Sequence, residues 1–145
     1  MTVETFHGMR RPLVVDASVA AKWLLPEPDS DATARLLEER DVAFHVPELF
    51  DAELGNALWK RVRRGDLAAK DAAAAVVLIA QIPATRHRHA GLLEGAMTLA
   101  LELSITVYDA LYVALAIALD ARLVTADRWL AERASRNVGV DSPLR

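Results

Sequence analysis

The chain has 145 residues, a typical size for one domain, and we expect a single domain over residues 1–145. Its 53% of hydrophobic and 26% of charged residues indicate a packed core and exclude a disordered chain. A formal net charge of -3 excludes a protein that coats nucleic acid through clustered basic residues, and the lack of cysteine leaves only oxygen or imidazole ligands for a metal.

The N-terminal part of the chain predicts a strand followed by a helix. Leu13–Val15 is a short apolar run after Pro12, which is typical of a parallel strand that is covered on both faces. A helix is expected from Ser18 onward. Pro26 and Pro28 are expected to close it, because proline lacks the backbone donor that a helix needs.

The middle of the chain predicts a long helix. Pro47 is expected near its first position, Arg64 near its last, and Gly65 is expected to stop it. The next segment, Leu67–Ile82, is apolar around most of a helical circumference. That pattern is typical of a helix buried against more than one neighbour, and a second subunit is one such neighbour.

The remaining pattern alternates strands with helices, which predicts the α/β class: a three-layer α/β/α sandwich around a central, mostly parallel sheet. No apolar run is long enough to span a bilayer and the first residues lack a signal sequence, so we expect a cytoplasmic protein without a membrane segment. The other expected elements are the strands Ala43–Val46, Ala84–Arg86, Arg122–Thr125 and Asn137–Val140 and the helices Asp29–Arg40, Leu92–Leu103, Tyr108–Leu119 and Asp127–Ser135.

Four acidic residues stand close to strand-to-helix junctions or inside the following helix: Asp16, Glu53, Asp109 and Asp127. A carboxylate among apolar residues is costly to bury unless a cation compensates its charge. Several carboxylates without other ligands suit Mg²⁺ or Mn²⁺. Ligands of parallel sheets bind beyond the carboxyl ends of the strands, where Asp16 and Asp127 are expected to meet.

Each acid also has a structural interpretation. Asp16, Asp109 and Asp127 are all close to helix starts, where a carboxylate caps free N–H groups. Glu53 lies well inside its helix, so it is either a ligand or an ordinary surface glutamate.

Three polar residues are candidates for supporting the acids. Ser18 is expected to cap the first helix rather than to act as a nucleophile, because no histidine stands in an evident partner position. Thr125 either orients a carboxylate or a metal-bound water, or is a plain strand threonine. Asn56, one turn after Glu53, either supports the site or is a surface residue.

A basic run, Lys60–Arg64, closes the Glu53 helix, where cations interact favourably with the helix dipole. Solvated cations are the default interpretation of this run. Because it shares a helix with a proposed ligand, Lys60, Arg61 and Arg64 are also candidates for contacts to a phosphate backbone. The cluster Arg86–His89 is a weaker candidate.

Four motifs occur in a specific order between Leu13 and Val140: VVDASV, P-E-L-x-x-x-E-x-x-N-A-L, YDALYVALA and LVTAD. They carry the four acids in turn, and the second also carries Asn56. Each motif alone is weak, but together they resemble a PIN domain, and specifically the VapC-type toxin ribonucleases of bacterial toxin and antitoxin pairs.

The resemblance implies a Mg²⁺- or Mn²⁺-dependent endoribonuclease in which Asp16, Glu53, Asp109 and Asp127 surround one or two ions. Ser18 and Thr125 match the small hydroxyl residues that accompany the first and last acids of the family. The resemblance further implies an RNA substrate, a cognate antitoxin that covers the active site, and a homodimer.

Two alternatives remain at this stage. A catalytically inactive PIN-like module that binds RNA or protein is disfavoured because the four acids are intact. A phosphatase of the haloacid dehalogenase type also begins with a strand ending in aspartate, but it requires a second aspartate where this chain has Ser18.

Overall fold

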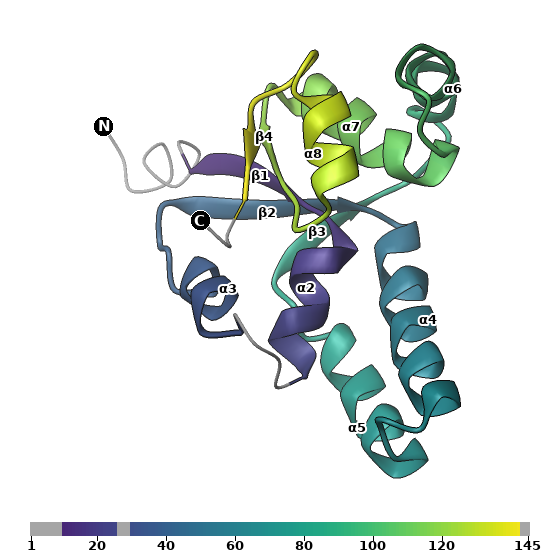
Figure 1. Ribbon diagram of the computed structural model, residues 1–145. Helices are drawn as coiled ribbons and strands as arrows, with labels where there is room; N and C mark the ends of the chain where they lie inside the picture. Colours follow the sequence, from purple (N-terminus) through teal and green to yellow (C-terminus); the bar gives the residue numbers. More distant parts are fainter. Residues whose placement is uncertain (1–9, 26–29, 143–145) are drawn as a thin grey trace.

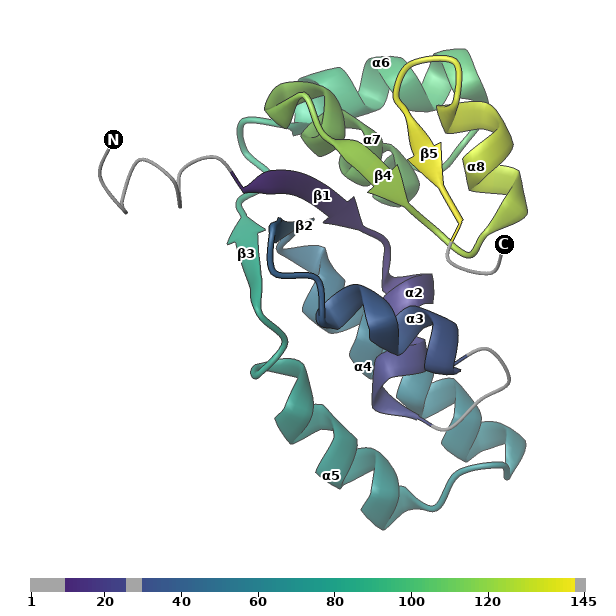
Figure 2. The same cartoon turned by 90° about the vertical axis from the view of Figure 1, so that its left-hand side faces the viewer.

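Five parallel strands form the centre of the computed structural model, which describes residues 10–25 and 30–142. In space the strands follow the order β3-β2-β1-β4-β5, so the first strand is central. The expected parallel sheet is thus confirmed (Figures 1 and 2). The strands are β1 (Arg11–Val15), β2 (Val42–Pro47), β3 (Ala84–His87), β4 (Arg122–Val124) and β5 (Val140–Asp141).

Helices cover both faces of the sheet, as the three-layer prediction requires. Both views place α2 to α5 below the sheet and α6 to α8 above it (Figures 1 and 2). The helices are α2 (Ala17–Leu24), α3 (Ser30–Leu37), α4 (Leu49–Arg64), α5 (Ala69–Ile79), α6 (Leu93–Leu103), α7 (Val107–Leu119) and α8 (Arg128–Ala134).

The central strand β1 has a neighbour on each side. Leu13 pairs with Phe44 of β2 and with Arg122 of β4. Leu13, Val14 and Val15 are all buried, because α2 lies below and α7 above this part of the sheet. An uninterrupted apolar strand is therefore stable here, whereas an alternating one would bury polar side chains.

The strand order reverses beside β1. The chain moves outward from β1 through β2 to β3 and then returns to place β4 on the opposite side of β1. The segments that leave β1 and β4 lead to helices on opposite faces of the sheet, α2 and α8 (Figure 2). Such a switch point opens a crevice at the carboxyl ends of the two strands. Asp16 and the segment Thr125–Asp127 occupy this position.

Several predicted boundaries are wrong, and the helix expected to run to Arg40 already ends at Leu37. Pro47 is the last residue of β2 rather than part of the following helix, and the next N–H, that of Glu48, continues the ladder by donating to the carbonyl of His87. The last strand does not include Asn137 or Val138, because both N–H groups donate to the carbonyl of Ala134 and so finish α8. Pro26 and Pro28, which were expected to close the first helix, and Asp29, which was expected to begin the next one, lie outside the described residues.

The predicted stop at Gly65 is confirmed. Gly65 has a positive φ of 83°, and its N–H donates to the carbonyl of Val62 while that of Asp66 donates to Arg61. Glycine adopts this left-handed conformation without the steric penalty of a side chain. The helix that carries Glu53 therefore ends here and turns back into α5.

Helix α5 differs from its prediction in length and in burial. It begins at Ala69 and buries Ala75 and Ile79. Val76, Val77 and Leu78 are exposed, so residues 10–25 and 30–142 do not provide the burial expected on more than one side.

Among the described residues, no single helix is long and apolar enough to cross a bilayer. Helices α6 and α7 reach that length and composition only together, across a bend of 114°.

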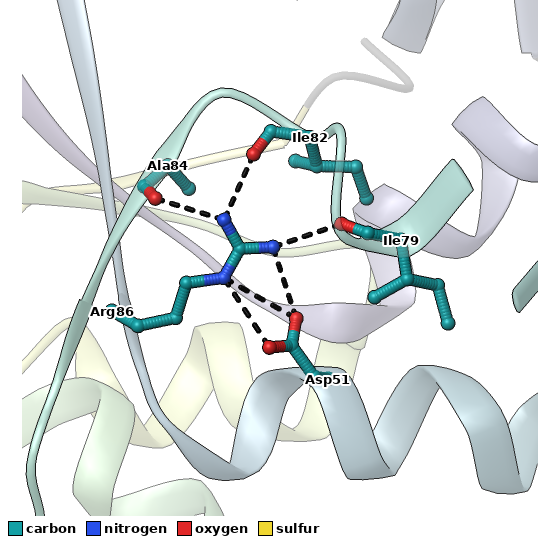
Figure 3. Close-up of polar contacts among 5 residues, drawn as sticks. All are labelled: Asp51, Ile79, Ile82, Ala84 and Arg86. Atoms are coloured by element: carbon teal, nitrogen blue, oxygen red, sulfur yellow. Dashed lines mark hydrogen bonds and ion pairs between the residues drawn. The ribbon is translucent and has the colours of Figure 1, made fainter. Parts of the chain in front are cut away.

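A guanidinium group fastens the first turn of α4 to the end of α5. Arg86 Nε and Nη2 both donate to the carboxylate of Asp51, and Nη2 also donates to the carbonyl of Ile79. Nη1 donates to the carbonyls of Ile82 and Ala84 (Figure 3). All five N–H groups of the guanidinium are thus used inside the protein. Arg86, a weak candidate for a phosphate contact, has a structural role instead.

We expect Arg86→Lys to lower the free energy of unfolding by about 1–3 kcal/mol, because an ammonium has only three donors and cannot bind a carboxylate in parallel. Urea unfolding followed by circular dichroism measures the change. Arg11→Lys is the matched control, since Arg11 forms an exposed ion pair with Glu39 at 3.3 Å and such pairs contribute about 0.5 kcal/mol. Equal stability of the two variants would contradict this role.

Candidate functional site

The carboxylate of Asp16 is held by two hydroxyl groups. Asp16 follows β1 and is buried, with 7% of its surface exposed. Its Oδ2 accepts hydrogen bonds from Ser18 Oγ at 2.9 Å and from Thr125 Oγ1 at 2.8 Å. Although Asp16 occupies the N-cap position of α2, its side chain makes no capping bond. The capping interpretation is therefore wrong for this residue.

The direction of both hydroxyl groups is fixed by the backbone. Ser18 Oγ accepts from the N–H of Ala126 at 3.1 Å, and Thr125 Oγ1 accepts from that of Asp127 at 3.0 Å. Each hydroxyl has a single hydrogen, and a carboxylate oxygen offers only acceptors, so both hydrogens point at Asp16. The 3.4 Å contact between the two hydroxyls then carries no hydrogen bond.

These contacts decide two open interpretations. Ser18 does not cap the first helix, because α2 already begins at Ala17 and Ser18 lies inside its first turn. Thr125, which is buried, does orient a carboxylate, as one of its two interpretations states.

Asp127 and Asp109 differ in how they relate to their helices. Asp127 is the N-cap of α8, where its Oδ1 accepts from the N–H groups of Trp129 at 2.9 Å and Leu130 at 3.2 Å. The capping interpretation is confirmed for Asp127. In α7 the cap is Thr106, whose hydroxyl accepts from the N–H of Asp109 at 3.1 Å. Asp109 itself is not a cap, and its carboxyl is half-buried.

Glu53 is tied to a buried phenol. The hydroxyl of Tyr112 donates to Glu53 Oε1 at 2.6 Å, and Tyr112 is fully buried in α7. Burial and then the charge of Glu53 raise the pKa of Tyr112, so the phenol stays a donor. Glu53 is half-buried, and the interpretation as an ordinary surface glutamate is wrong.

Tyr112 was missed by sequence reasoning. The sequence could have indicated it, because Tyr112 is the one residue with a polar side-chain group between Ala110 and Leu119. It follows Asp109 by three positions, which places both on one side of a helix.

The four acids act on one another electrostatically. Burial and then the charges of Asp16 and Asp127 raise the pKa of Asp109 to about 6. For Glu53, burial raises the pKa, the bond from Tyr112 lowers it, and the charges of Asp16 and Asp109 raise it again. We call Asp16, Glu53, Asp109 and Asp127 the acid set.

Asp16 itself has a raised pKa. Burial is the largest cause, the bonds from Thr125 and Ser18 oppose it, and the charge of Asp127 adds to it. In the described part of the chain, the charged groups that shift the pKa values of Asp16, Glu53 and Asp109 all belong to the acid set.

The donor type and charge of the acid set suit a hard divalent cation such as Mg²⁺ or Mn²⁺, which prefers oxygen ligands and would relieve the mutual repulsion. As the side chains stand, however, no three acidic or imidazole groups among the described residues are close enough to hold one ion. Existing bonds explain part of this: Glu53 Oε1 is bound to Tyr112 and Asp127 Oδ1 to two backbone N–H groups. Binding would require these carboxylates to reorient.

The remaining candidates lie along α4. Asn56 is exposed, one turn after Glu53. Lys60 and Arg64 follow Glu53 by seven and eleven positions, which places all three on one side of the helix, about 10 and 16 Å further along its axis. Arg61 Nε and Arg64 Nη2 both pair with Asp66, at 3.1 and 3.5 Å.

Comparisons with known proteins agree on one family. Residues 13–135 match the model of the PIN domain. Ribonuclease VapC3 from Pyrobaculum aerophilum is 38% identical to this chain over 123 residues, which cover 83% of the chain and 93% of that protein.

Solved structures show the same fold. PAE2754 from Pyrobaculum aerophilum superposes with a TM-score of 0.70 at 25% identity, over 91% of this chain and 85% of that one. VapBC2 from Rickettsia felis, solved bound to a DNA fragment from their promoter, superposes with a TM-score of 0.63 at 16% identity, over 90% of this chain and 98% of that one. At the lower identity the likeness concerns the fold alone.

We expect Asp109→Asn to stabilise the protein near neutral pH when divalent metal is chelated. A carboxyl whose pKa rises from 3.8 to about 6 on folding binds more protons folded than unfolded, so its contribution to stability falls as pH rises through that window. The variant removes this penalty, worth roughly 1 kcal/mol after allowance for partial solvent exposure. Urea unfolding should show the gain at pH 7.5 and its loss near pH 4.

Asp41→Asn, in an exposed turn before β2, controls for the loss of one charge. A gain that is equal in both variants, or independent of pH, would contradict the assignment of the penalty to the site.

Proposed function

The chain belongs to the PIN domain family, and we propose that it is a metal-dependent endoribonuclease that hydrolyses RNA phosphodiester bonds and acts as the toxin of a toxin and antitoxin pair. One observation carries the proposal: a buried aspartate, oriented by two hydroxyls at the switch point of a parallel sheet, shares its electrostatic environment with three other acids. The ribonuclease activity for which the relative VapC3 is named supports it.

In this proposal the acid set holds Mg²⁺ or Mn²⁺, which when bound acidifies a water and offsets charge on the phosphate. Asp16 is the fixed point of the set, because Ser18 and Thr125 restrict its carboxylate to one orientation. Glu53 is kept facing the set by the hydroxyl of Tyr112. A preoriented set of this kind loses little conformational freedom when it binds a metal ion.

Asp109 is suited to proton transfer. Its half-buried carboxylate shares an electrostatic environment with Asp16 and Asp127, so it supplies oxygens that can take up a proton at the place where the acid set holds its ligand. We propose that Asp109 performs this step and that no covalent intermediate forms. The absence of cysteine from the chain is consistent with that choice.

We further propose that Lys60, Arg61 and Arg64 contact the RNA backbone. Lys60 and Arg64 lie on the side of α4 that carries Glu53, and cations there attract phosphates. The pairing of Arg61 and Arg64 with Asp66 would have to open for a full contact.

An antitoxin protein and a homodimer complete the proposal. The structural likeness to VapBC2 is consistent with a protein partner. The exposed Val76, Val77 and Leu78 of α5 supply apolar surface that a second protein chain would bury.

Purified protein should cut RNA in the presence of Mg²⁺ or Mn²⁺, and chelation should stop the reaction. Asp16→Asn and Asp109→Asn should each lower the rate by about 100-fold or more, because each removes a charge from the acid set. Gel analysis of the RNA fragments measures this. Asp41→Asn should cut like the wild type, and cleavage that survives chelator or persists in Asp16→Asn would rule out the proposed site.

Mn²⁺ should raise the melting temperature of the wild type, because a ligand that binds only the folded state stabilises it by about 2.7 kcal/mol at 100 times its dissociation constant. Differential scanning fluorimetry at millimolar Mn²⁺ measures the shift. The shift should be smaller in Asp16→Asn and unchanged in Asp41→Asn. A wild type without a shift, or an equal shift in Asp16→Asn, would argue against a shared metal site.

A further inference from the structure

Three aromatic side chains are largely exposed in the described part of the chain: Trp59 (58%), Tyr108 (65%) and Trp129 (55%). Two of them are close to the acid set in the sequence, since Tyr108 precedes Asp109 and Trp129 follows Asp127 by two positions. A single exposed aromatic is common on protein surfaces. Trp129 differs from the other two in its bond to Asp127 and in the close stacking of Arg133 on its ring.

The backbone of Trp129 is bonded directly to a member of the acid set. Its N–H donates to Asp127 Oδ1 at 2.9 Å, in the first turn of α8. The next residue, Leu130, is fully buried and anchors this turn in the core. The backbone of Trp129 is therefore held at a fixed place next to Asp127, while more than half of the side chain is in solvent.

A cation is stacked on this indole. The guanidinium carbon of Arg133, one turn later, lies 3.2 Å from the ring centroid of Trp129. Arg133 Nε is buried and has no hydrogen-bond partner among the described residues. The charge is thus held against one face of the ring.

A polar hollow lies on the adjoining side of α8. It has a volume of about 580 Å³ and begins at Thr125 and Asp127. Arg128, Glu132 and Ser135 continue its lining along the helix. Binding sites for small ligands begin at about 300 Å³, so the hollow has room for a nucleotide beside Asp127.

We propose that Trp129 is a stacking platform for an unpaired base of the RNA substrate, immediately next to the scissile phosphate, with Arg133 stacked behind the ring. This inference rests on the proposed ribonuclease function and adds to it a residue that positions the substrate beside the acid set. Every base has a flat π-face, so an indole accepts it without reading its identity. A base paired within a duplex cannot reach the ring, because it is stacked between its neighbours.

The first test compares Trp129→Leu and Trp129→Phe with the control Trp59→Leu, which removes an equally exposed indole from α4. Steady-state cleavage of a single-stranded oligonucleotide that spans a mapped cut site gives KM and kcat. Trp129→Leu should raise KM about tenfold with kcat changed by less than about threefold, and Trp129→Phe should recover most of the loss. Trp59→Leu should behave as the wild type.

Abasic substitution sharpens the comparison. At one position beside the cut, removal of the base should raise KM for the wild type about tenfold and have no effect in Trp129→Leu. Equal effects of base removal in both proteins, or an unchanged KM in Trp129→Leu, would overturn the platform. An unchanged KM in Trp129→Leu would overturn the platform even if that variant bound a partner protein more weakly.

Binding separates this inference from the proposed function. In the Asp16→Asn background, an oligouridylate should quench tryptophan fluorescence, and Trp129→Phe should remove most of the quenching. A wild type that does not cut RNA refutes the ribonuclease proposal, whereas quenching that persists in Trp129→Phe refutes the platform. Circular dichroism and melting temperature confirm that each variant is folded.

Discussion

One oxygen atom, Oδ2 of Asp16, connects the two strands that border the crevice of this sheet. Asp16 follows β1, whereas Thr125 and Ala126 follow β4. Two backbone N–H groups of the β4 side donate to the hydroxyls of Thr125 and Ser18, and both hydroxyls donate to Asp16. This chain of bonds aligns the start of α2 with the start of α8. The other acids of the set are placed around this oriented carboxylate.

The rest of the fold brings two helices to that point. Helix α7 is buried above the sheet and presents Asp109 and Tyr112, and α4 presents Glu53 to the phenol of Tyr112 at 2.6 Å. The hydrogen bonds from Arg86 to Asp51 hold the first turn of α4, and Asp51 is two residues before Glu53. Apolar burial supplies most of the stability of such a frame, while these few polar bonds set the orientation of the acids.

The arrangement is costly for the protein alone. The pKa values of Asp16, Glu53 and Asp109 are raised, which means that the folded state disfavours their charged forms. Natural proteins accept such a cost at functional sites, because the same concentration of charge attracts a cation. The membership of the chain in the PIN domain family, the shared fold and this electrostatic strain agree with one another.

The sequence by itself determined the α/β alternation, the central strand and the stop at Gly65, because hydrophobic periodicity and backbone preferences are local. It also identified the four acids as a group, by their motifs. Only the tertiary structure decided that Asp127 is a cap and Asp16 is not, and that Ser18 and Tyr112 each bind an acid. The reason is physical: the bond from Thr125 to Asp16 joins residues 109 positions apart, and no local pattern records which distant side chains the packing of the sheet brings together.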